Sequence, residues 1–169
     1  ERALTCTSDK ERQELLNVVI VGGGATGVEV AGALSEMKNF VIPKDYPDLS
    51  NSLMNIYLIE SQDRLLAAMS EKSSASVLKY LRTMGVNVLL NKRVTDYKDN
   101  TVYMNDGSTI ATRTFIWVTG VAAHKVDNMP TESIGRGGRF LVNEFNQVQG
   151  MKDVYSIGDQ CLMPNVDPN

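Results

Sequence analysis

A glycine-rich stretch near the start of the chain has the residue types and spacing to hold a phosphate-bearing ligand. Gly22, Gly24 and Gly27 follow an apolar run at residues 18–21 and precede apolar residues at roughly helical spacing. In a strand–turn–helix unit, the first glycine permits the tight turn and the second lets the backbone approach a pyrophosphate. The third lets the helix pack closely on the strand. The pattern predicts a dinucleotide-binding turn, and a structural turn without a ligand is the alternative.

A second chemical feature is Glu60, which ends an apolar stretch at residues 55–60 that is typical of a strand. An acid in this place can accept hydrogen bonds from both ribose hydroxyls of an adenosine and would repel a 2′-phosphate, so it favours NADH over NADPH. Its separation from Gly22 exceeds the roughly 20 residues that are usual. A proposed insertion at residues 38–54, which contains two prolines, accounts for the excess. An ordinary exposed acid at a strand end is the alternative.

The start of the first predicted helix supplies further candidates. At Ala25 and Thr26, backbone N–H groups would face a bound phosphate. Glu29 follows in the same helix and is the candidate catalytic residue. It is either a carboxylate favoured by the helix dipole or a group beside the nicotinamide that orients it or handles protons. Arg64 could stack on adenine or contact phosphate, although a surface arginine is the commoner role.

Several other kinds of chemistry are disfavoured. His124 is the one histidine, and Cys6 and Cys161 lie near opposite ends without a CxxC pair, so we expect neither a metal site nor a disulfide scaffold. A net charge of −3 gives no basic surface for nucleic acid. No apolar stretch approaches the roughly 20 residues that cross a bilayer, and the first residues are charged rather than signal-like. We therefore expect a cytoplasmic location.

The elements that must position these residues form a repeating strand–helix pattern. The first helix is expected at 26–37, and a second between Ser70, a good N-cap, and Gly85, a good stop. Buried strands are expected at 18–21, 55–60, 86–90 and 115–118. Short alternating segments at 94–97, 101–104 and 108–112 are separated by Asp99-Asn100 and Asp106-Gly107, both of which favour hairpin turns.

These elements predict a three-layer α/β fold of the Rossmann-like, FAD/NAD(P)-binding kind. Its parallel sheet carries an antiparallel β-meander in place of one crossover helix. The expected organisation is a lead-in or linker at residues 1–16, an NADH-binding domain at 17–120 and a returning segment at 121–169. In the last part we expect strands at 138–143 and 151–157, followed by Gly158-Asp159.

Four stretches of the chain resemble a known group of flavoproteins. They read GGGATGVEVAGAL, IYLIESQDRLL, FIWVTGV and DVYSIGDQC. Together they are similar to the FAD-dependent pyridine nucleotide-disulfide oxidoreductase superfamily. Within it, the chain resembles the type II, non-proton-pumping NADH:quinone dehydrogenases. The similarity extends from about residue 15 to about residue 163.

The resemblance implies that hydride passes from NADH to FAD and that electrons pass on to quinone. It assigns the three glycines of the turn to the NADH pyrophosphate and Glu60 to the adenosine ribose. Glu29 and Gly120 would lie near the nicotinamide, and Gly158 and Asp159 would contact FAD. The group's own FAD-binding glycine motif is missing from this sequence. We therefore expect an excised NADH domain that is inactive alone, taken from a protein that lies peripherally on the cytoplasmic face of a membrane.

The sequence also allows two alternative functions and a homodimer. An NADPH-dependent disulfide reductase would carry CxxC where Cys6 stands alone, and arginines where Glu60 is followed by Ser61-Gln62-Asp63. A non-catalytic NAD-binding regulatory module would share the glycine turn but would not need Asp159. Unpaired strand edges in the returning segment could also join two copies into a homodimer.

Overall fold

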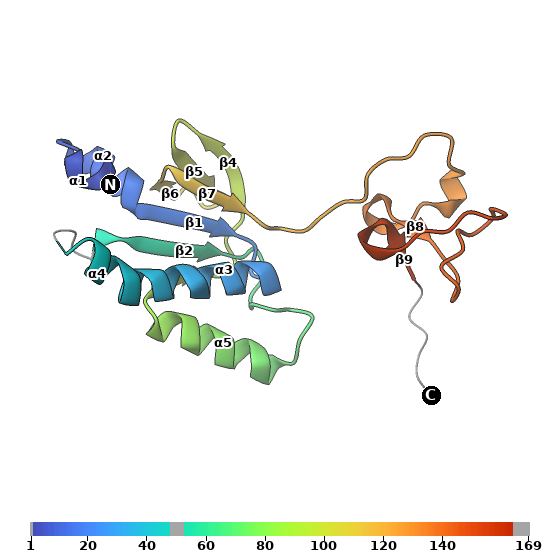
Figure 1. Cartoon of the computed structure of the whole chain (residues 1–169), viewed down its shortest axis with the longest axis horizontal. Coiled ribbons are helices and arrows are strands. Elements are labelled where there is room, and N and C mark those ends of the chain that lie inside the picture. Colours follow the sequence, from blue (N-terminus) through green and yellow to red (C-terminus); the bar gives the residue numbers. More distant parts are fainter. Residues whose placement is uncertain (1, 48–52, 164–169) are drawn as a thin grey trace. The chain divides into compact units, whose positions relative to one another are not determined.

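The computed structural model describes residues 2–47 and 53–163 (Figure 1). The chain divides into two compact units, Glu1–Thr119 and Gly120–Asn169. The first unit is built on a four-stranded parallel sheet in the order β3-β2-β1-β7. Its strands are β1 (Asn17–Val21), β2 (Asn55–Ile59), β3 (Val86–Leu89) and β7 (Thr114–Trp117). The four strands expected from the apolar runs are therefore present, with ends shifted by about one residue.

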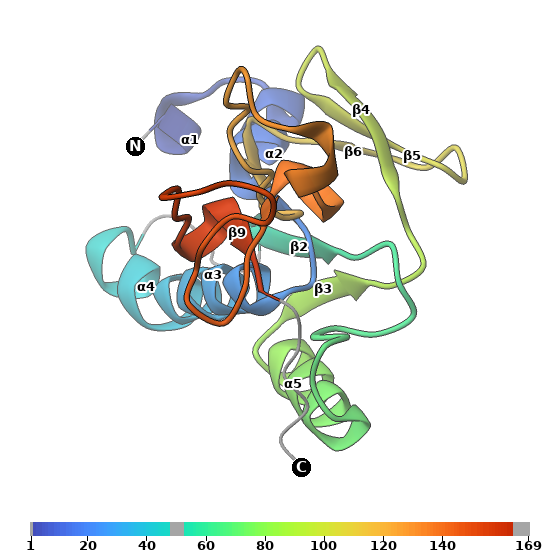
Figure 2. The ribbon, with the colours of Figure 1, turned by 90° about the vertical axis from the view of Figure 1, so that its right-hand side faces the viewer.

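Helices cover one face of this sheet and a meander covers the other (Figure 1). The helices are α3 (Ala25–Glu36) and α5 (Glu71–Thr83). The meander consists of β4 (Val94–Lys98), β5 (Thr101–Met104) and β6 (Thr109–Ala111). Figure 2 shows α5 and the meander on opposite sides of β2 and β3. The predicted three-layer fold, with a meander in place of one crossover helix, is confirmed.

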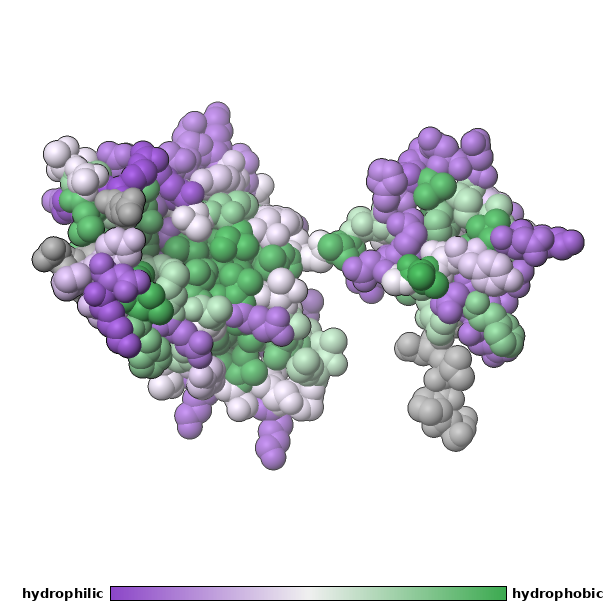
Figure 3. Space-filling model, viewed as in Figure 1, coloured by the Kyte–Doolittle hydropathy of each residue, from purple (hydrophilic) through white to green (hydrophobic). Residues whose placement is uncertain are grey.

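Alternation along β1 explains the three layers, because successive strand residues point to opposite faces. Val18 and Ile20 pack in the helix-side core with Ala31. Val19 and Val21 pack in the meander-side core. In the space-filling view of this unit, hydrophobic residues gather near the middle of the face and hydrophilic ones lie toward its rim (Figure 3).

The turn residues behave as their types predict. Asp99 and Asn100 join β4 to β5 with φ of 50° and 57°, the left-handed region that hairpin turns require. Ser70 caps α5, its hydroxyl accepting from the Ser73 N–H at 3.2 Å. Gly85 follows this helix with a φ of 85°. Both ends of α5 are therefore set by local sequence.

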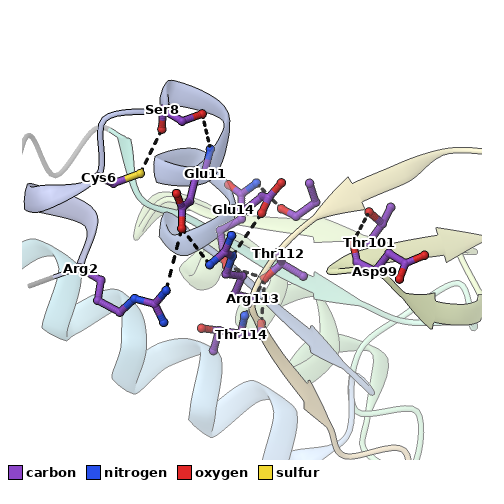
Figure 4. Close-up of polar contacts among 12 residues, drawn as sticks. Arg2, Cys6, Ser8, Glu11, Glu14, Asp99, Thr101, Thr112, Arg113 and Thr114 are labelled. Carbon is purple, nitrogen blue, oxygen red and sulfur yellow. Dashed lines mark hydrogen bonds and ion pairs between the residues drawn. The ribbon is translucent and has the colours of Figure 1, made fainter.

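The first sixteen residues do not form a linker. They contain α1 (Arg2–Thr5) and α2 (Asp9–Leu16), and α2 leads directly into β1. Arg113, between β6 and β7, holds α2 in place by ion pairs to Glu11 at 3.0 Å and Glu14 at 3.2 Å (Figure 4). The Arg113 N–H also donates to the Glu14 carbonyl at 2.8 Å. These contacts join the segment to the first unit.

The proposed insertion at 38–54 begins as a continuation of the first helix. After α3 the chain forms a π-helical turn at Met37–Val41 and then α4 (Ile42–Asp45). Pro43 lies at the start of α4, where its missing N–H costs no intrahelical bond. The segment is therefore not a continuous regular α-helix, as expected, but its path stays helical to Asp45. Residues 48–52 of the insertion lie outside the described residues.

The second unit has little regular structure. A short parallel pair joins β8 (Phe140–Leu141) to β9 (Cys161–Leu162), and a small core contains Phe140, Val142 and Val148. The strand expected at 138–143 is shorter in the structure, where only β8 forms within this range. The strand expected at 151–157 is wrong, because Asp153 has a φ of 61° and interrupts the extended run. In its place, a single bridge pairs Tyr155 with Gln147.

Across the described parts of both units, no helix is long and apolar enough to cross a membrane.

Candidate dinucleotide-binding site

Gly22 forms the tight turn that ends β1. Its φ is +117°, and a Cβ at this position would lie 2.6 Å from the carbonyl oxygen of Val118. The Gly22 N–H donates to the Ile59 carbonyl at 2.9 Å, which ties the turn to the end of β2. The chain itself therefore requires glycine here, through both its backbone conformation and the neighbouring strand.

Gly27 has a similar internal explanation. A Cβ at this position would overlap the carbonyl oxygen of Gly22 and would lie 3.4 Å from the Leu58 side chain. The absence of a side chain lets the first turn of α3 pack directly on the glycine turn and β2. This is the close helix–strand packing expected of the third glycine.

Gly24 differs from both, because nothing in the described structure requires it to be glycine. Its φ of −73° and ψ of −175° suit any residue, and apart from its two neighbours in the chain no described residue has an atom within 4 Å of a Cβ built on it. It is the N-cap of α3, and that helix receives no capping hydrogen bond from a described side chain. Ala25 and Thr26, which follow, are exposed. The space before the helix start is open and lined by backbone, which fits an approaching pyrophosphate.

Glu60 lies directly after β2, beside the glycine turn. Its Oε2 accepts a hydrogen bond from the Gly23 N–H at 2.6 Å. Its Oε1 accepts from the Gln62 N–H at 2.8 Å and the Ser61 hydroxyl at 3.0 Å. The structure thus brings Glu60 and the glycine turn together at the carboxyl edge of the sheet, where ligands bind in folds of this kind. Its contact with a ribose stays a prediction.

Gly23 is a structural residue that the spacing of the glycine motif does not single out. A Cβ on it would lie 2.7 Å from the Leu65 side chain and 2.9 Å from the Cβ of Glu60. Its carbonyl accepts from the Leu66 N–H at 2.8 Å, so the turn is also tied to the loop after β2. The run of three consecutive glycines was the available indication, because the motif itself leaves this position unspecified.

Arg64 lies in the same loop, and its side chain is hydrogen-bonded within that loop. One guanidinium nitrogen donates to the Ala67 carbonyl at 2.8 Å. Leu65 beside it is fully buried, and its carbonyl accepts from the Ser74 hydroxyl at the start of α5. Arg64 therefore helps shape this loop, and contact with an adenine or phosphate remains a prediction.

Glu29 is exposed in the second turn of α3. Dipole stabilisation decays within the first turn of a helix, so it explains an acid here only weakly. Among the described residues, no hydrogen bond or ion pair involves its carboxylate. Its role near the nicotinamide stays a prediction.

The remaining candidates lie in the second unit. Gly120 has a φ of +117° and Gly158 a φ of +66°. Asp159 is exposed in a 3₁₀ turn (Gly158–Gln160), and its carbonyl accepts from Arg139 at 3.0 Å. The backbone of His124 pairs with the Gln160 side chain. No cluster of metal-binding side chains occurs in the described parts of the chain.

Sequence comparison finds relatives of this chain among quinone oxidoreductases. The chain is 34% identical over 165 residues to a type II NADH:quinone oxidoreductase of Haemophilus influenzae, which covers 94% of this chain and 37% of that protein. It is 36% identical over 160 residues to an external alternative NAD(P)H-ubiquinone oxidoreductase of Arabidopsis thaliana, covering 90% of this chain and 28% of that protein. The chain thus spans about a third of the length of these curated relatives.

Structural comparison agrees on the fold. NDH2 from Plasmodium falciparum, solved in complex with NADH, matches with a TM-score of 0.82 and 24% identity over 95% of this chain and 35% of that one. The sequence profile of the pyridine nucleotide-disulphide oxidoreductases matches residues 2–168, almost the whole chain. The chain therefore belongs to the pyridine nucleotide-disulphide oxidoreductase family.

Proposed function

We propose that this chain is the NADH-binding part of a FAD-dependent NADH dehydrogenase that passes electrons on to quinone. The main observation in support of NADH binding concerns Gly24. The fold does not require a glycine there, and Gly24 lies at the N-terminus of α3, which has no side-chain cap. Similarity to NADH:quinone oxidoreductases supports this assignment over a disulfide reductase or a regulatory module.

In this proposal, the turn at Gly22, Gly24 and Gly27 holds the pyrophosphate against the N–H groups of Ala25 and Thr26. The positive end of the α3 dipole favours the phosphate charge. Glu60 accepts from the adenosine ribose and disfavours a 2′-phosphate, because two negative charges would then meet in the same place.

The second unit would contribute to a flavin site. Gly158 and Asp159 are the residues of this chain that would hold FAD, and Glu29 and Gly120 would lie near the nicotinamide. FAD, when bound, supplies the ring that accepts the hydride. We further propose that the whole protein reduces quinone from a peripheral position on the cytoplasmic face of a membrane. Homodimerisation through strand edges of the second unit belongs to the same proposal.

The first test is calorimetric titration of the 169-residue chain with NADH and with NADPH. We expect NADH to bind and NADPH to bind more weakly, because Glu60 lies beside the glycine turn and its negative charge would repel a 2′-phosphate. Equal or tighter binding of NADPH contradicts the proposed selectivity. Absence of NADH binding in a folded chain contradicts the function.

The second test replaces Gly24 with valine. The backbone there suits valine, so the variant should keep its circular dichroism spectrum while losing NADH binding, because the side chain fills the space before α3. Gly32→Ala is the matched control, since Gly32 lies in α3 and a Cβ on it also meets no atom within 4 Å apart from its chain neighbours and the nearby backbone of its own helix. Unchanged NADH affinity in folded Gly24→Val would mean that the turn is only structural.

A further inference from the structure

We propose that the Ser61 hydroxyl is a specificity-determining group that competes with the adenosine ribose for Glu60. This inference rests on the proposed function and extends it to the residue that follows Glu60. The competition follows from how many hydrogen bonds the carboxylate of Glu60 already accepts, and from which of their donors can move.

The carboxylate of Glu60 is nearly saturated. An ionised carboxylate offers about four acceptor sites, two on each oxygen. Oε1 has two donors, the Ser61 hydroxyl at 3.0 Å and the Gln62 N–H at 2.8 Å. Oε2 has one donor, the Gly23 N–H at 2.6 Å. About one site therefore remains, while the two hydroxyls of an adenosine ribose need two.

Two of the three donors are held by the backbone. The Gln62 carbonyl accepts from the Asn91 N–H at 2.9 Å, and the Glu60 carbonyl accepts from the Lys92 N–H at 3.0 Å, so this segment is paired with the chain after β3. The Gly23 carbonyl is likewise paired, with the Leu66 N–H. Neither backbone N–H can turn away without breaking these contacts.

The Ser61 hydroxyl is the donor that can leave. Its side chain is exposed, and its O–H turns about a single bond. When it turns, Oε1 gains a free site and Glu60 can accept both ribose hydroxyls. The released hydroxyl can then donate outward, for example to a 2′-phosphate. Ser61 thus weakens NADH binding and reduces the discrimination against NADPH.

The experiment compares wild type and Ser61→Ala by calorimetry with three probes: NADH, NADPH and an NADH analogue that lacks the adenosine 2′-hydroxyl. We expect Ser61→Ala to bind NADH about two- to tenfold more tightly, the range of one modest hydrogen bond. Affinity for NADPH should not rise. Affinity for the analogue should be unchanged, because its single adenosine ribose hydroxyl already has a free acceptor.

Ser61→Thr and Ser61→Val form a matched pair of equal shape, in which threonine keeps the hydroxyl and valine lacks it. Ser61→Val should bind NADH more tightly than Ser61→Thr, by about the same factor as Ser61→Ala relative to wild type. This pair tests the inference even if alanine disturbs the loop. Unchanged or weaker NADH binding in both hydroxyl-free variants overturns the inference, as does an equal gain for the analogue. Wild type that binds no NADH overturns the proposed function, and this inference with it.

Discussion

The four glycines in and after the turn that follows β1 serve two different purposes. Gly22, Gly23 and Gly27 are required by the chain itself, because a Cβ on any of them would collide with backbone or side-chain atoms. Gly24 has no such constraint and instead faces open space. A glycine that the fold does not require is better evidence for a ligand than one that the fold requires.

Replacing Gly27 with alanine should destabilise the protein by about 1–3 kcal/mol or more, because the added methyl overlaps the Gly22 carbonyl. Gly32→Ala, in the same helix, should instead stabilise it by about 0.5–1 kcal/mol, because alanine is the better helix former and the Cβ has room. Urea unfolding followed by circular dichroism measures both. Equal effects of the two substitutions would contradict the close packing of α3 on the turn.

Replacing Glu60 with glutamine should raise NADPH affinity relative to NADH by about ten- to hundredfold, because the charge that repels the 2′-phosphate is removed. Competitive titration of the two nucleotides measures the ratio. Asp63→Asn is the control, since Asp63 is an exposed acid of the same loop. If both substitutions shift the ratio of NADPH to NADH affinity equally, the selectivity comes from the total negative charge of the loop and not from Glu60.

The meander is an element whose short strands are joined by charged and polar turns. Lys92, which follows β3, pairs with Asp106 in the turn between β5 and β6. Hydrogen bonds from the Lys92 ammonium, and then from Ser108, hold the pKa of Asp106 well below its ordinary value. This pairing ties the turn of the meander to the end of the parallel sheet, close to the loop that contains Glu60.

Replacing Lys92 with methionine should raise the pKa of Asp106 toward the ordinary carboxyl range, as measured by NMR titration of the side-chain carboxyl carbon. Because the native pKa is depressed, the pairing stabilises the fold above the ordinary carboxyl pKa and is lost as the pH falls through the native value. The stability difference between wild type and variant should therefore shrink on acidification. Ser108→Ala should raise the pKa less. An unchanged pKa in Lys92→Met would contradict the pairing.

At the level of the whole molecule, the two units have separate cores. The first unit buries both faces of its sheet, whereas the second has a small cluster around Phe140, Val142 and Val148. The larger core accounts for the regular architecture of the first unit. The second unit relies more on turns, a two-stranded pair and side chains such as Arg139 and Gln160 that bond to backbone.

The 169-residue chain, purified alone, should hold no FAD and show no NADH:quinone activity. One glycine turn of the dinucleotide-binding kind occurs in the sequence, and Glu60 is bound to it. Asp159 by itself cannot offset the roughly 4–15 kcal/mol of translational and rotational freedom that FAD would lose. Visible absorbance with and without added FAD, followed by a quinone-reduction assay, tests this. A yellow stoichiometric complex that oxidises NADH would contradict it.

Local sequence was sufficient to predict the parallel sheet, α3, α5 and the meander of the first unit, because these elements are specified by short-range patterns. The apolar runs of β1 and β2, the cap at Ser70, the stop at Gly85 and the hairpin residues Asp99-Asn100 each act on their own neighbours. The same patterns failed in the second unit. There, Asp153 takes a left-handed conformation that its residue type allows but does not require.

The sequence by itself determined the fold class and the positions of the glycine turn and its acid, because both follow from residue type and spacing. Only the tertiary structure decided that α2 packs on the first unit, since the pairing of Arg113 with Glu11 and Glu14 joins residues about a hundred positions apart. Only the tertiary structure separated Gly24 from the glycines around it, and filled three acceptor sites of Glu60. Steric clearance and hydrogen-bond occupancy depend on which distant atoms arrive at a site, and residue spacing along the chain does not contain that information.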